Sequence, residues 1–168
     1  MNLEQLIVLI LILLITGIGL AALTLLCDVI LMRFVRRARA AISQLPLRAL
    51  IIGGINFVFF GVVGFVLFAV AQEAENGGAN GIAGILRLLG GVEILALASF
   101  LILGLTASAR WVGEKIAPEA HAPRQIISGI VALELASLAP LVGWIVVPFA
   151  ATLIGYGAVI VALVRRRE

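Results

Sequence analysis

The chain of 168 residues is 63% hydrophobic and only 12% charged, with a formal net charge of +3. A soluble domain is about 45–50% apolar and about 25% charged, so this composition excludes a water-soluble globular domain and a disordered chain. We therefore expect an all-α integral membrane protein, a bundle of four to five helices that forms a single transmembrane domain over residues 1–168.

Long apolar stretches predict where the helices lie, because a membrane-spanning helix needs ~20 predominantly apolar residues. The first stretch lacks the preceding basic residues of a signal peptide, so we expect it to be retained. The arginine-rich segment that begins at Arg33 is expected to continue this first helix past the membrane. Helices are predicted at about 5–35, 49–72, 82–109, 125–142 and 146–164.

Residues 125–164 are expected to form a helical hairpin. They hold a single charged residue, Glu134. As one helix they would measure ~60 Å, twice the hydrocarbon core, and two prolines interrupt the middle. A re-entrant pair of shorter helices is the alternative. The turn is predicted at Pro140, Gly143, Trp144 and Pro148.

Basic residues gather in the loop 33–48 and at the C-terminal end, whereas the segment 73–81 carries acidic residues and no base. By the positive-inside rule, loop 33–48 and the C-terminus are expected in the cytoplasm and the N-terminus outside. Because the charges cluster at span ends, they indicate topology rather than nucleic-acid binding. The residues expected to face anionic lipid headgroups or a partner are Arg33, Arg36, Arg37, Arg39, Arg165, Arg166 and Arg167.

Three charged residues fall inside predicted spans: Arg87, Glu93 and Glu134. Charged groups within a membrane are costly, so each is a candidate functional residue. Glu93 and Glu134 are expected at comparable depth, where two carboxylates could hold or relay a proton. The alternative is a structural role, in which each is neutral or pairs with Arg87, a hydroxyl group or another subunit.

The sequence predicts no enzyme. Its one histidine and one cysteine provide neither a nucleophile with an oriented base nor a metal-ligand cluster, so we expect no catalytic residues, no metal and no cofactor. Small residues recur at helical spacing and predict close helix packing, either within the bundle or against another subunit. These residues are Gly17, Ala21, Gly53, Gly61, Gly64, Gly104, Ser108, Gly155 and Gly157.

The segments 108–116 (SARWVGEKI) and 128–167 resemble a membrane module found in bacterial bactofilin-like or polymer-forming-associated membrane proteins of poorly defined function. The similarity extends to Pro46-Leu47-Arg48. This resemblance implies a platform in the bacterial cytoplasmic membrane that anchors or organises other components. We expect no soluble polymer-forming part within these 168 residues, and the first helix to be additional to the module. The matching residues are Trp111, Gly113, Gly129, Leu135, Pro140, Gly143, Trp144, Gly155, Gly157 and the closing basic residues.

These observations predict a non-catalytic membrane scaffold or accessory subunit of a larger bacterial membrane complex. Its expected partners are anionic lipids and other membrane subunits or further copies of itself, and no nucleic acid. The alternative is a small ion- or solute-translocating protein that uses Glu93 and Glu134.

Overall fold

The computed structural model describes residues 2–138 and 142–164, and within them it is α-helical without strands. This confirms the predicted all-α class. The described helices are α1 (Leu3–Ile30), α2 (Met32–Gln44), α3 (Pro46–Asn76), α4 (Asn80–Ile116), α5 (Ala122–Ser137) and α6 (Val142–Val164).

Three described helices are long and apolar enough to cross a membrane: α3, α4 and, within α6, Ile145–Val164. The second half of α1 together with α2 gives a fourth candidate if this bent pair is counted as one span. Most large apolar side chains of these helices are exposed, among them Phe65 at 74% and Leu95 at 70%. Such an exterior suits lipid rather than water, and the protein is a membrane protein.

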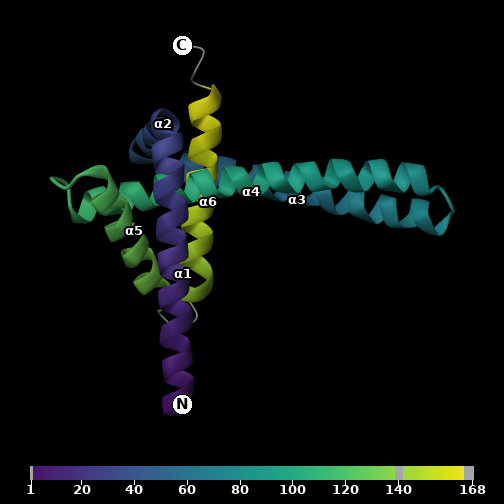
Figure 1. Ribbon diagram of the computed structural model, residues 1–168. Helices are drawn as coiled ribbons and strands as arrows, with labels where there is room; N and C mark the ends of the chain where they lie inside the picture. Colours follow the sequence, from purple (N-terminus) through teal and green to yellow (C-terminus); the bar gives the residue numbers. More distant parts are fainter. Residues whose placement is uncertain (1, 139–141, 165–168) are drawn as a thin grey trace.

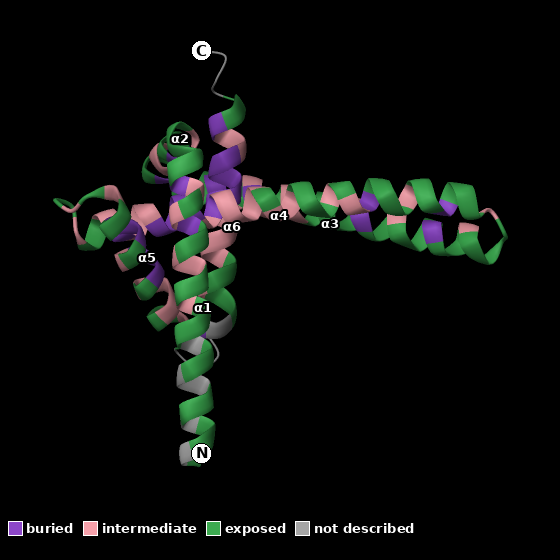
Figure 2. Ribbon diagram, viewed as in Figure 1, coloured by how far each residue is buried: buried purple, intermediate pink, exposed green. Residues whose placement is uncertain are grey.

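The helices cross rather than run parallel (Figure 1). The hairpin of α3 and α4 extends crosswise to α1 and α6. Helix α2 lies near the last described turn of α6. Buried residues concentrate where α3 and α4 pass α6 (Figure 2). We call this place the crossing, and we call residues 54–103, the part of the hairpin beyond it, the arm.

Glycines make the crossing possible. A Cβ added at Gly104 of α4 would overlap the backbone of Gly155 and Tyr156 in α6, and one added at Gly53 of α3 would overlap the backbone of Leu153 and Gly157. The backbones therefore touch directly, as small residues allow in membrane helices. The predicted close packing within the chain is thus confirmed for Gly53, Gly104, Gly155 and Gly157.

A third close contact joins α4 to α5. A Cβ at Gly129 would overlap the carbonyl group of Ala109, and one at Gly113 would overlap the backbone of Gln125. Ser108 reinforces the neighbouring contact, because its hydroxyl group donates a hydrogen bond of 2.7 Å to the carbonyl oxygen of Ala151 in α6. Helix α4 is therefore held on two sides, by α5 and by α6.

The predicted continuation of the first helix to residue 35 is wrong. Helix α1 ends at Ile30, and the chain bends by 106° into α2. Four apolar residues share one face of α2 and are buried against the crossing: Val35, Ala38, Ala41 and Ile42. A straight extension would leave this amphipathic face without a partner. The bend at Leu31 therefore lets α2 bury its apolar side.

The predicted turn residues also need correction. Helix α6 begins at Val142, so Gly143, Trp144 and Pro148 lie within it rather than in a turn. Pro140 lies outside the described residues. Helix α5 has 16 residues and is therefore about 24 Å long, shorter than the ~30 Å hydrocarbon core. For α5 this length favours the re-entrant alternative over a full crossing.

Candidate functional site

A buried ion pair lies at the crossing. Arg110 of α4 donates a hydrogen bond of 2.6 Å to Asp28, in the last turn of α1, and their side chains are only 12% and 5% exposed. One helical turn further along α4, Glu114 lies 3.1 Å from Arg39 of α2. The two pairs attach α4 to the chain on both sides of the Leu31 bend.

Sequence reasoning missed the buried pair, because Asp28 and Arg110 had the positions of ordinary loop charges at the ends of apolar stretches. The available signal was that both were expected on the same side of the membrane. The structure shows that loop 33–48 and the end of α4 do lie together, since Arg39 and Glu114 form an ion pair. The pair between Asp28 and Arg110 is placed to fix the helix arrangement.

Glu134 of α5 lies beside α1. Its carboxylate occupies the space that a side chain at Gly17 would need, and its Oε1 atom is buried without a hydrogen-bond partner among the described residues. It lines a cavity of about 540 Å³ between α1, α4, α5 and α6. The other lining residues are Ile12, Thr16, Leu20, Leu105, Ile130, Leu133, Ser137, Leu138, Pro148, Ala151 and Thr152.

No described residue that lines this cavity carries a positive charge. Two of its hydroxyl groups are already committed, because Ser137 donates to the carbonyl oxygen of Leu133 and Thr152 donates to that of Pro148. Glu134 is therefore a polar group in largely apolar surroundings. A polar group in such a place lowers stability unless it is paired.

We expect Glu134→Met to raise the stability of the protein by about 1 kcal/mol or more, because methionine fills a similar volume without a buried unpaired carboxyl group. The measurement is the midpoint of thermal unfolding in detergent. Lower stability in this variant would show that Glu134 makes a favourable interaction and would contradict its interpretation as an unpaired polar group.

Glu93 lies elsewhere, in the arm. It faces Gly64 of α3, and both of its carboxylate oxygens are buried without a hydrogen-bond partner among the described residues. The cavity near Glu134 reaches α4 at Leu105, twelve residues beyond Glu93 and thus about 18 Å along the helix axis. The two carboxylates face different helix pairs, and the structure does not bring them together.

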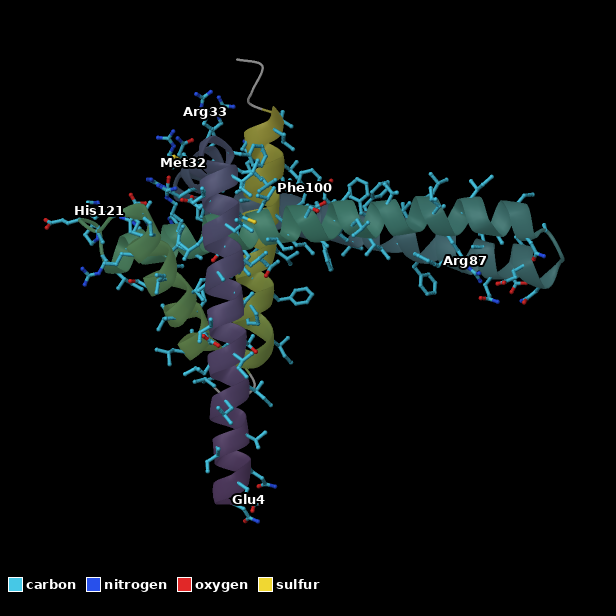
Figure 3. The ribbon with its side chains drawn as sticks, in the orientation of Figure 1. Glu4, Met32, Arg33, Arg87, Phe100 and His121 are labelled. Atoms are coloured by element: carbon cyan, nitrogen blue, oxygen red, sulfur yellow. The ribbon has the colours of Figure 1, made fainter. Side chains whose placement is uncertain are left out.

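Arg87 does not pair with Glu93. It forms an ion pair with Glu75 of α3 and lies 3.3 Å from the side-chain oxygen of Gln72, near the far end of the arm (Figure 3). The side chains of Arg87 and Glu75 are 44% and 42% exposed. This pair therefore links the ends of α3 and α4 on the outside of the arm.

The basic residues expected to face lipid or a partner divide into three groups. Arg33, Arg36 and Arg37 are exposed on α2 (Figure 3 labels Arg33), opposite its buried apolar face. Arg39 is held by Glu114. The residues at positions 165–167 lie outside the described part of the chain. An exposed basic face next to apolar helices is suited to contact with anionic headgroups.

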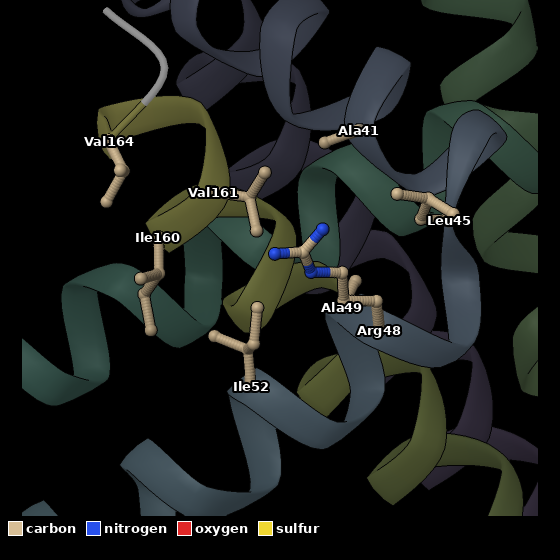
Figure 4. A pocket seen from close by; sticks show the side chains of 8 residues that line it. All are labelled: Ala41, Leu45, Arg48, Ala49, Ile52, Ile160, Val161 and Val164. Carbon is tan, nitrogen blue, oxygen red and sulfur yellow. The ribbon is translucent and has the colours of Figure 1, made fainter.

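A second cavity, of about 340 Å³, lies at the corner where α2 ends and α3 begins, beside α6 (Figure 4). Arg48 is its only charged lining residue among those described; the others are Ala41, Leu45, Ala49, Ile52, Ile160, Val161 and Val164. Across the described residues, no three His, Cys, Asp or Glu side chains gather as a metal site would need. The cavities are thus lined mainly by aliphatic side chains, each with a single charged group.

No family model, curated protein or solved structure matches this chain. The resemblance to the membrane module of bactofilin-like proteins therefore stays a prediction.

Proposed function

We propose that this protein is a non-catalytic scaffold or accessory subunit of a larger complex in a bacterial cytoplasmic membrane, and that it holds other membrane helices through its arm. The observation that carries this proposal is a set of uncovered glycines. Whereas the glycines of the crossing touch another backbone, a Cβ added at six arm glycines would have nothing within 4 Å. Gly78 and Gly81 are at the tip of the arm, and the other four are Gly54, Gly61, Gly84 and Gly91.

These uncovered glycines are spaced for helix docking. Gly54 and Gly61 are seven residues apart on α3, and Gly84 and Gly91 are seven apart on α4, so each pair lies on one face of its helix. Small residues at such spacing let another helix approach closely in a membrane. Within the chain this approach is already used at the crossing, which supports the same use of the arm by a partner.

The distribution of charged residues supports the expected orientation. We call the end of the molecule that carries the exposed arginines of α2 the basic end. The exposed arginines of α2 lie near the end of α6, away from the acidic residues at the tip of the arm. We propose that this end faces the cytoplasm and contacts anionic headgroups, with the N-terminus outside. The chain would thus be anchored at its basic end while the arm extends into the bilayer.

A translocating protein that uses Glu93 and Glu134 together is the weaker candidate. Each carboxylate lies in its own setting, one against Gly64 and the other against Gly17. No described residue lines the cavities of both. A relay between them would need polar groups along the whole path, whereas the hydroxyl groups of these cavity walls, Thr16, Ser137 and Thr152, all lie in the cavity of Glu134.

The proposal predicts that the chain purifies with partners when it is extracted from its native membrane in mild detergent. Mass spectrometry of the particle should find other chains, or additional copies of this one. Gly61→Leu combined with Gly91→Leu should remove them, because leucine on the docking face blocks close helix contact. Val66→Leu, on another face of α3, is the matched control and should retain them.

The proposal fails if the wild-type chain purifies alone, or if the double variant keeps the same partners as the control. The yield and the thermal unfolding midpoint of each variant must be measured in parallel. Because neither glycine contacts another part of the chain, these values should remain close to the wild type.

A further inference from the structure

The cavity at the corner between α2 and α3, which we call the corner cavity, contains a cationic side chain that no described residue neutralises. Arg48 is exposed and forms no ion pair with a described residue, in contrast to Arg39, Arg87 and Arg110. In Figure 4 its guanidinium group extends from α3 toward α6, between apolar side chains of both helices. The described cavity wall offers no carboxylate to neutralise it.

The N-terminus of α3 adds a second positive feature at the same corner. Helix α3 begins at Pro46 without a side-chain cap and without an acidic residue in its first turn. The first hydrogen bond of this turn runs from the amide group of Ala49 to the carbonyl oxygen of Leu45, so the amide groups of Leu47 and Arg48 have no intrahelical acceptor. Free amides at a helix N-terminus attract anions, phosphate groups in particular.

The walls of the cavity are apolar and lead outward. Ile52 and Ile160 line it from α3 and α6, and at its rim Val164 is 70% exposed and Leu45 is 44% exposed. An inorganic anion would use only Arg48 and the helix end. A molecule with an anionic head and an aliphatic tail would use the walls as well.

We propose that this corner binds an anionic phospholipid of the surrounding membrane. Its phosphate group lies on Arg48 and the N-terminus of α3, and one acyl chain begins along Ile52 and Ile160. The position fits, because the corner is where the apolar part of α3 begins and that of α6 ends, next to the exposed arginines of α2. Basic pockets between helices on the cytoplasmic side recognise lipid headgroups in this way.

This inference deepens the proposed membrane role, but it does not depend on the docking of the arm. A chain that purifies alone and still retains anionic lipid would contradict the scaffold proposal and leave the lipid site intact. A chain that purifies with partners but shows no preference for anionic lipid would support the scaffold proposal and contradict the lipid site.

The test titrates the purified full chain in detergent with phosphatidylglycerol or with phosphatidylcholine of the same acyl chains, and measures retained lipid by native mass spectrometry. We expect phosphatidylglycerol to bind more tightly. Arg48→Gln should weaken its binding about tenfold, the loss of one charge-assisted contact. Arg124→Gln, which removes an exposed arginine of α5 outside the cavity and outside the basic face of α2, is the matched control and should change binding less than twofold.

Two further experiments separate the contributions of the lipid headgroup and the acyl chain. Ile160→Ser should also weaken phosphatidylglycerol binding, and inorganic phosphate at equal concentration should not displace the lipid. Equal loss in the Arg48 and Arg124 variants would overturn the site in favour of general surface attraction. Displacement by inorganic phosphate, or an unchanged affinity in the Ile160 variant, would overturn the assignment of a lipid.

Discussion

Gly104→Leu is expected to destabilise the protein by about 3 kcal/mol or more, a large part of the stability of a typical domain. The side chain of leucine would have to occupy space that the backbone of Gly155 and Tyr156 fills, and a backbone cannot move aside as a flexible side chain can. The contact between α4 and α6 would therefore open. Thermal unfolding in detergent and the fraction of protein that elutes as a single species measure the effect.

Gly91→Leu provides the matched control on the same helix. A Cβ at Gly91 would have nothing within 4 Å, and leucine favours helix over glycine by roughly 1 kcal/mol. The free energy of unfolding should therefore stay the same or rise slightly. Equal destabilisation by the two substitutions would show that Gly104 is not a point of direct backbone contact.

Asp28→Leu is expected to cost about 3–5 kcal/mol, because it leaves the guanidinium group of Arg110 without its partner in a place that is only 12% exposed. Since this pair joins the end of α1 to α4, its loss should also loosen the bend into α2. The midpoint of thermal unfolding measures the first effect. Faster proteolysis near Leu31 would report the second.

Two comparisons sharpen this prediction. Glu75→Gln removes one partner of the exposed pair with Arg87 and should change stability by only about 0–1 kcal/mol. Asp28→Leu combined with Arg110→Leu should be less destabilised than Asp28→Leu alone, because no buried charge is then left unpaired. A double variant that is as unstable as the sum of both single variants would contradict a direct interaction.

Much of the fold could be predicted because the membrane restricts it. Long apolar stretches predicted the cores of α3 and α4, which the structure extends from 49–72 to Pro46–Asn76 and from 82–109 to Asn80–Ile116. The helices continue past the apolar stretch because hydrogen bonding along the backbone does not stop where polarity changes. The crossing glycines were also visible, since close helix packing requires small residues.

The Leu31 bend could not be predicted from local sequence, because neither glycine nor proline marks it. It follows from the burial of one face of α2 against helices that come later in the chain. The same holds for Asp28 and Arg110, which are 82 residues apart.

The candidate site was only partly visible in the sequence. The sequence marks Glu93 and Glu134 as unusual, and the structure leaves buried carboxylate oxygens of both without a partner among the described residues. Their mutual position depends on how the arm crosses the other helices, which apolar stretches do not specify. In the sequence, Arg48 has the position of an ordinary basic residue in a cytoplasmic loop. The structure shows that it lines a cavity between the start of α3 and the end of α6.

The claim that the arm is a docking surface is tested most directly by photocrosslinking in the native membrane. A photoreactive residue is placed at position 58 or 88, midway between the paired glycines of α3 or α4, where Val58 and Leu88 are 63% and 67% exposed. A docking surface should give a discrete protein adduct from both positions and none from position 66. Adducts with lipid alone at positions 58 and 88 would contradict it.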